Sequence, residues 1–340
     1  MKKHTTFFRT PKAFLLGACS LFAVSTLVYS CKKESPTEMP DKSNAMNLSA
    51  VSRSGPALSV INGRLVFATS GDFEAQMQNI QNMTDADRLI WSNAQTGFTS
   101  VLAAYDQADN NANNGQGITA DSMIRSHRMM DVPDYAFATV LSSNGLLQID
   151  DSIYVYTISG DIYAVPEAYE NQIADGSYLN LAGVRKMTAA GNTPEGNCNW
   201  FDNNREIYKL NNGNDFPQHN GRRVRWVVTK WNSWWGVYSS CGYRLKMQKD
   251  TRFAGWVNNT SPQWFKATSG WEGLAKFINL PPAPRNEPVY TQTNSGQLYL
   301  TRTMVWYGGV ATPQLCYYST KFPGFFEVNY GGYASYTWNH

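Results

Sequence analysis

The spacing of apolar residues changes several times between residues 58 and 185, which predicts a mixture of helices and strands. Phe73, Met77 and Ile80 recur at helical spacing and predict a helix over Ser70–Met83 with Ser70 as its cap. Thr84 opens a capping-box pattern and predicts a second helix through Trp91. A third helix is expected over Phe98–Ala108, followed by a polar loop over Asp109–Gly117.

Alternating and β-branched runs predict the strands of the same region. Ile61–Ala68 alternates and is expected to form one short strand. Three further runs are separated by turn residues at Asp150-Asp151 and Ser159–Asp161, so they predict a three-stranded meander. These runs are Leu146–Ile149, Ile153–Ile158 and Ile162–Val165.

The second half of the chain alternates over longer stretches and predicts mainly strands. Arg222–Trp231 and Val237–Met247 form an expected two-stranded ribbon, with Asn232–Gly236 as the turn. Further strands are predicted at Leu298–Trp306 and Phe325–Trp338, and a proline-rich loop at Pro281–Pro288. The expected fold class is α+β, in which a mixed helical and β-meander N-terminal part precedes an antiparallel β sandwich or barrel-like C-terminal domain.

The N-terminus carries the pattern of an export signal. Four basic residues precede an apolar run at 13–28, which is shorter than the about 20 residues of a membrane-spanning helix. Val28-Tyr29-Ser30-Cys31 follows, and the chain then becomes polar. These features predict a signal peptide at 1–30 and a disordered tether at 31–57 that is lipidated on Cys31. A mixed α/β region at 58–190 and an aromatic-rich β domain at 191–340 complete the expected organisation.

The Val28–Cys31 segment resembles the lipobox of bacterial lipoproteins, and the junction after it resembles those of Bacteroidota outer-membrane lipoproteins. A weaker resemblance to uncharacterised lipoproteins of that group covers roughly residues 58–170. The resemblance implies a cell-envelope location, with the outer membrane as the expected site and the lipid as the membrane contact, and it implies no catalytic residue. Ser122 and Ser152, each preceded by Asp and followed by an apolar residue, resemble the O-glycosylation acceptors of that group.

Composition limits the partners and the chemistry. Without the basic residues ahead of Cys31, Lys and Arg nearly balance Asp and Glu, so no nucleic-acid partner is expected. The spacing of the cysteines and histidines predicts no metal site and no cofactor. Beyond Cys31, the exported chain holds Cys198, Cys241 and Cys316, which allow at most one internal disulfide. Cys241 with Cys316 is the first choice, and a bond from Cys198 to either of them stays open.

The strongest candidate for a ligand surface is the ribbon in the second half. If its apolar side chains point inward, its cations share the outer face, because alternate residues of a strand face opposite sides. Guanidinium and ammonium groups bind acidic groups, and exposed indole rings stack on sugars. The candidate ligand-binding residues are Arg223, Arg225, Arg244 and Lys246, together with Trp234 and Trp235 at the turn.

This surface favours a non-enzymatic binder of a glycan or another surface component, with an acidic or sulfated glycan as the first expectation. Two alternatives remain open. A polysaccharide hydrolase would need two carboxyl groups roughly 5 to 9.5 Å apart, drawn from different loops, and spacing along the sequence does not show that distance. A structural or assembly lipoprotein would bind a protein partner through its aromatic strand edges.

Overall fold

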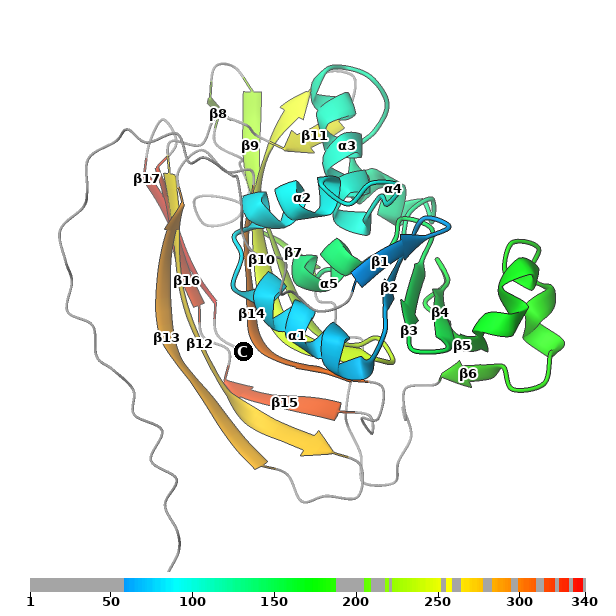
Figure 1. Cartoon of the computed structure of the whole chain (residues 1–340). Helices are drawn as coiled ribbons and strands as arrows, with labels where there is room; N and C mark the ends of the chain where they lie inside the picture. Colours follow the sequence, from blue (N-terminus) through cyan, green and yellow to red (C-terminus); the bar gives the residue numbers. More distant parts are fainter. Residues whose placement is uncertain are drawn as a thin grey trace, which may run out of the picture. The chain divides into compact units, whose positions relative to one another are not determined.

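A computed structural model defines one compact unit from Arg53 to His340. For the strands from Trp264 to Asn294 and from Leu315 onward, it describes the backbone only. Helices and antiparallel sheets occur together, which confirms the α+β class (Figure 1). The described residues are 58–187, 205–208, 218–219, 222–251, 255–258, 264–277, 283–294, 299–309, 315–321, 324–329 and 333–338.

The helices of the first half begin at side-chain caps, as the sequence predicts. Thr84 caps the second helix through a hydrogen bond from the Asp87 amide, whereas the first helix is capped by Thr69 and not by Ser70. The predicted loop at Asp109–Gly117 is wrong in its first part, because Asp109 and Ala112 are buried and the third helix continues through them. The helices are α1 (Ser70–Gln81), α2 (Asp85–Asn93), α3 (Val101–Asn113), α4 (Ala120–Arg125) and α5 (Tyr135–Val140), with 3-10 turns η1 (Glu167–Gln172) and η2 (Ser177–Asn180).

The first sheet has the strand order β1-β2-β3-β4-β5-β6. The single strand predicted at Ile61–Ala68 is wrong, because Asn62 and Gly63 both have positive φ and turn the chain into a hairpin. The meander is confirmed. The strands are β1 (Leu58–Ile61), β2 (Arg64–Phe67), β3 (Leu146–Ile149), β4 (Ser152–Tyr156), β5 (Ile162–Pro166) and β6 (Arg185–Met187).

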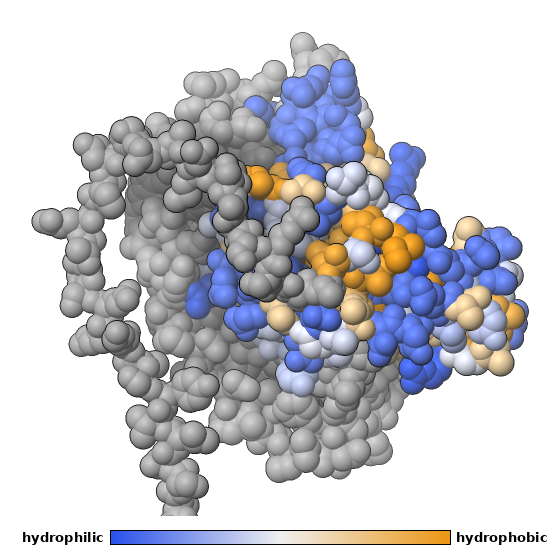
Figure 2. Space-filling view, viewed as in Figure 1, coloured by the Kyte–Doolittle hydropathy of each residue, from blue (hydrophilic) through white to orange (hydrophobic). Residues whose placement is uncertain are grey.

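Strand β1 lies at the edge of this sheet and carries apolar side chains on the surface. Leu58 and Val60 are half-buried and Ile61 is exposed. Figure 2 shows apolar atoms gathered in the area where Figure 1 places β1.

The second sheet contains the predicted ribbon, and its described strands all pair antiparallel. The turn is narrower than expected: β9 continues to Trp234, and the chain reverses at Trp235–Val237, where Gly236 has a φ of 76°. The order β11-β10-β9-β7 is joined by β14 on β10 and β8 on β9. The strands are β7 (Arg205–Tyr208), β8 (Gln218–His219), β9 (Arg222–Trp234), β10 (Tyr238–Thr251), β11 (Gly255–Asn258) and β14 (Tyr299–Gly308).

The third sheet corrects two predictions. Pro281–Pro288 is not entirely a loop, because β13 includes Pro284 and Pro288; β13 ends the path β13-β12-β16-β17, where a strand tolerates proline. Phe325–Trp338 forms a hairpin and not one strand. Through the described pairings, none of the three sheets closes on itself. The strands are β12 (Trp264–Phe277), β13 (Ala283–Asn294), β15 (Leu315–Lys321), β16 (Gly324–Asn329) and β17 (Tyr333–Trp338).

A common core joins the helices to the second sheet. Helices α1 and α2 contact β14, and α3 contacts β11, so that the helices lie over this sheet (Figure 1). Phe137 of α5 stacks on Trp235 and Tyr238 of the ribbon. The domain boundary predicted near residue 190 falls mainly on residues outside those described and stays a prediction. Among the described helices, none has the length and apolar character needed to cross a bilayer.

Candidate functional site

The cationic surface predicted on the ribbon is wrong for three of its four cations. Arg225, Arg244 and Lys246 are only 8%, 3% and 2% exposed. Arg244 and Lys246 contact residues of the first half, and Arg225 contacts Gln248 and Trp256 of the same sheet. The strands alternate as expected, but the face that carries these cations is covered. Of the apolar residues expected on the inner face, Tyr243 is fully buried. The side chains of the others lie outside those described: Val224, Trp226, Val228, Leu245 and Met247.

Acidic and carbonyl groups from the first half compensate for the burial of these cations. Arg244 donates to the Pro133 carbonyl at 3.1 Å, and its guanidinium lies 4.3 Å from the centroid of the Tyr135 ring. Lys246 lies between Asp109 and Asp121. Burial alone would lower the pKa of Lys246, but the attraction of Asp121 and other neighbouring groups outweighs it and raises this pKa. A buried cation with such partners stabilises the interface and is not available to an external ligand.

Arg223 is the exposed member of the predicted set. Its guanidinium donates to the Asp250 carboxyl group at 2.5 and 3.0 Å and lies 5.6 Å from the centroid of the Trp256 ring. An exposed ion pair of this kind contributes little to stability because water screens it. Arg223 alone does not form the multivalent surface that the sequence predicts for an acidic glycan.

Asp134 organises a buried hydrogen-bond network between α5 and the second sheet. Its Oδ2 atom accepts from the Tyr238 hydroxyl and from Ser240 Oγ, each at 2.6 Å. Its Oδ1 atom accepts from the Ala136 amide at 2.9 Å and from Thr303 Oγ1 at 3.2 Å. The carboxyl group therefore caps α5 and holds two strands at once. This network is structural, and none of its residues lines the cavity at the β9–β10 turn.

A cavity of about 180 Å³ lies where the β9–β10 turn meets the β4–β5 turn. Its apolar wall includes Met130, Tyr156 and Trp235. The Tyr156 hydroxyl donates to the Trp235 carbonyl at 2.7 Å and so fixes the two turns to each other. Burial raises the pKa of Tyr156 well above its usual value, which keeps the phenol protonated as a donor. The volume is below the roughly 300–1,000 Å³ of drug-sized sites and suits a single small ring.

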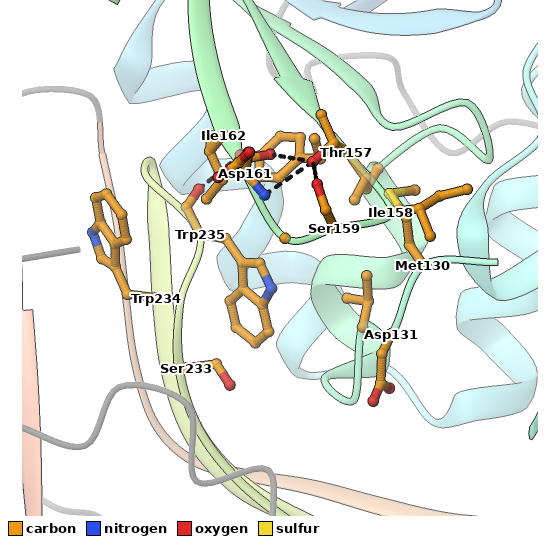
Figure 3. A pocket seen from close by; sticks show the side chains of 14 residues that line it. Met130, Asp131, Thr157, Ile158, Ser159, Asp161, Ile162, Ser233, Trp234 and Trp235 are labelled. Carbon is orange, nitrogen blue, oxygen red and sulfur yellow. Dashed lines mark hydrogen bonds between the residues drawn. The ribbon is translucent and has the colours of Figure 1, made fainter. Parts of the chain in front are cut away.

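Polar groups form the opposite side of this cavity. Thr157 Oγ1 and Ser159 Oγ are 2.8 Å apart, and the Asp161 amide donates to Thr157 Oγ1 at 2.9 Å. Figure 3 shows the Trp235 ring between this turn and Ser233, with Asp131 across the open space. The described lining includes two acids, Asp131 and Asp161, and neither Lys nor Arg. The chemistry of this cavity therefore favours a neutral or cationic ligand that carries hydroxyl groups.

The two tryptophans predicted as ligand contacts both line the cavity but differ in position. Trp235 stacks on Phe137 with ring centroids 5.2 Å apart, and its ring faces the other labelled side chains in Figure 3. The Trp234 ring lies apart from them. Both rings are largely buried, so the freely exposed stacking platform expected from the sequence is absent at these two residues.

The remaining predicted modification sites stay predictions. Cys241 is buried in β10 and Cys316 belongs to β15, in a different sheet, while Cys31 and Cys198 lie outside the described residues. The Ser122 hydroxyl accepts from Arg125 at 3.0 Å. Ser152 donates to the neighbouring Asp151 carboxyl group at 3.1 Å.

The polar side of the cavity could not be predicted from the sequence, because its residues come from separate turns. Thr157 and Asp131 are distant in the chain, and no local motif links either of them to Trp235. Comparison of the chain with protein-family models, with curated proteins and with solved structures found no match.

Proposed function

We propose that this chain is a non-enzymatic envelope lipoprotein whose cavity at the β9–β10 turn binds one ring of a neutral, hydroxyl-rich ligand, such as a glycan end. The observation that carries the proposal is the pairing of the Trp235 ring with hydroxyl and carboxyl groups in one small cavity. The part of the Trp235 ring that lines the cavity packs against the C–H groups of a sugar ring, while carboxyl and hydroxyl oxygens accept its O–H groups.

The charge of the lining argues for a neutral ligand over the acidic glycan expected from the sequence. Asp131 is exposed at the cavity and adds negative potential, whereas Asp161 is paired with Lys186 at 2.8 Å. An anionic ligand would have to approach Asp131 without a lining cation to offset the repulsion. A sugar hydroxyl would instead donate to the same carboxyl group.

The proposed location is the outer membrane, with the lipid on Cys31 as the anchor and the stretch up to residue 57 as a tether. The basic start, the apolar run and the small residue before Cys31 support it. A sandwich arrangement of the second half is proposed with it. The approach of β14 to β12 and β13 supports two sheets that face each other.

We expect the Cys31→Ala substitution to abolish lipidation and to release the protein from the membrane fraction, because it removes the thiol to which the lipid is attached. Metabolic labelling with a clickable fatty acid, followed by fractionation, measures both effects. Cys19→Ala, within the predicted apolar run, serves as the control and should leave the labelling unchanged. Label retained on the Cys31→Ala protein would refute the anchor.

The binding proposal is tested by titration calorimetry on the detergent-solubilised full-length protein, with panels of neutral and acidic glycans. The Asp131→Ala substitution is expected to weaken binding of a neutral glycan about tenfold, because a hydrogen bond to a charged acceptor contributes roughly 1.5–3 kcal/mol. Glu74→Ala removes an exposed acid from α1, outside the cavity, and should bind like the parent.

Three results would contradict the proposal. They are the absence of neutral-glycan binding, a preference for acidic glycans, and equal affinity in the parent and the Asp131→Ala protein. Hydrolysis of a bound glycan that is lost in Asp131→Asn would favour the hydrolase instead, since Asp131 and Asp161 both line the cavity.

A further inference from the structure

A buried amine lies between two buried carboxyl groups, away from the cavity. Nζ of Lys246 in β10 is 3.5 Å from Asp121 Oδ1 and 3.8 Å from Asp109 Oδ2. The three side chains are only 2–3% exposed. Nζ also lies 5.9 Å from the centroid of the Tyr135 ring, which forms part of the enclosure. An amine and a carboxyl group are thus held against each other and away from bulk water.

The neighbours orient the two carboxyl groups differently. Asp109 Oδ1 accepts from the Ala120 amide at 2.8 Å, and this bond holds the Asp109 side chain of α3 against the first residue of α4. Asp121 Oδ2 accepts from Gln248 Nε2 at 2.9 Å. Arg225 donates twice to Gln248 Oε1, at 2.8 and 2.9 Å, and a guanidinium can only donate. Arg225 therefore fixes the orientation of the Gln248 amide, and its NH₂ group must face Asp121.

We propose that Lys246 and Asp121 join in an intramolecular isopeptide bond, formed by the folded chain itself, with Asp109 as the proton carrier. Nζ attacks Cγ of Asp121, a C–N bond forms, and the bond from Cγ to Oδ1 breaks. Asp109 takes a proton from the nitrogen and passes it to the departing oxygen. One amine and one carboxylic acid give one amide and one water, with no oxidant or cofactor. Gln248 donates to the oxygen that carries the charge of the tetrahedral intermediate.

The reaction needs two conditions. First, the amine and the acid must be neutral, and burial favours the neutral forms of both because each charge loses its hydration. The negative carboxyl groups raise the pKa of Lys246, so before Nζ attacks, Asp109 must carry one proton from the ammonium group to Oδ1 of Asp121. Second, the two reacting groups must stay close together. Groups held in a fixed arrangement react as if at effective concentrations of about 10⁵–10⁸ M, which favours the bond between Lys246 and Asp121.

The test is peptide mapping and intact mass spectrometry of the full-length protein, denatured after it has folded. We expect a branched peptide that joins Lys246 to Asp121, lighter by one water than its two parts. Asp121→Asn should reach the same final mass as the parent, because it loses ammonia instead of water and gives the same amide. Lys246→Arg keeps the positive charge but lacks the amine, and Asp109→Asn lacks the proton carrier, so both should retain the unreacted mass.

Lys186→Arg is the matched control, because Lys186 also pairs with an aspartate but is exposed. It should form the Lys246 bond as the parent does. The proposal is overturned if the folded parent gives no branched peptide, if the loss of water persists in Lys246→Arg, or if Lys246 is joined to Asp109 instead. If a variant fails to fold, the peptide map of the parent decides alone.

Discussion

The Asp134→Ala substitution is expected to lower the free energy of unfolding by about 4 kcal/mol, because it removes the acceptor of four hydrogen bonds, three of them buried. The Tyr238 and Ser240 hydroxyls would lose their partner at Oδ2, and α5 would lose its cap from the Ala136 amide. The Tyr238 hydroxyl itself accepts from Gln81 at 2.5 Å, so the loss extends to α1. These contacts join the helices to the ribbon, and their removal should loosen that interface first.

Urea unfolding followed by circular dichroism measures this effect. Asp151→Ala serves as the control: Asp151 is exposed in the β3–β4 turn, and its removal should cost less than about 0.5 kcal/mol. Asp134→Asn is expected to fall near the alanine variant, because its NH₂ group would meet donors where the parent has an acceptor. A loss below about 1 kcal/mol in Asp134→Ala would show that the network contributes little.

The Gly145→Ala substitution is expected to have the second large effect and to lower the free energy of unfolding by about 3 kcal/mol or more. Gly145 has a φ of 78°, and a Cβ atom there would lie 2.1 Å from the Tyr156 carbonyl oxygen and 3.2 Å from Met130 Sδ. The Tyr156 amide donates to the Gly145 carbonyl at 2.7 Å, so the backbone cannot move away without breaking this bond. Positive φ alone costs alanine about 1 kcal/mol, and the contact with the backbone adds the rest.

Gly115 separates these two contributions. Its φ of 77° is nearly the same, but a Cβ atom added there would meet nothing within 4 Å. Gly115→Ala should therefore cost only about 1 kcal/mol in the same urea experiment. Equal losses in the two variants would mean that the close approach to Tyr156 is unimportant. A larger loss in Gly145→Ala would measure the steric part directly.

Local signals explain most of what the sequence predicts correctly. Thr84 and Asp87 define the start of α2 because a cap and its amide are three residues apart in the chain. Turn residues likewise separate β3, β4 and β5. The hairpin at Asn62-Gly63 also had a local signal, since this pair favours the turn that joins two strands. The alternation of Ile61–Ala68 hides that signal because the alternation continues across the turn.

Long-range contacts explain what the sequence could not predict. A strand pattern shows that Arg244 and Lys246 share one face, but it does not show whether water or another element covers that face. Asp121 and Pro133, which lie far earlier in the chain, cover it in the structure. Hydrophobic patterning assigns apolar residues to the interior. In this protein, however, a charged face is buried, because its counter-charges are buried with it. Pro284 and Pro288 are a second example of a long-range effect. A strand can hold them because β13 lies at a sheet edge, and only the strand order shows this.

Strands β2 and β3 have a further consequence for how this chain acquires its structure. They pair in parallel, Val66 beside Gln148, although all five described helices lie between them in the sequence. Closing so long a segment costs chain entropy before any contact between the strands can compensate for it. The rate of folding should therefore depend on how early the helices compact, because their packing shortens the effective distance between the two strands. Until β3 arrives, the hairpin of β1 and β2 would remain unpaired on one side.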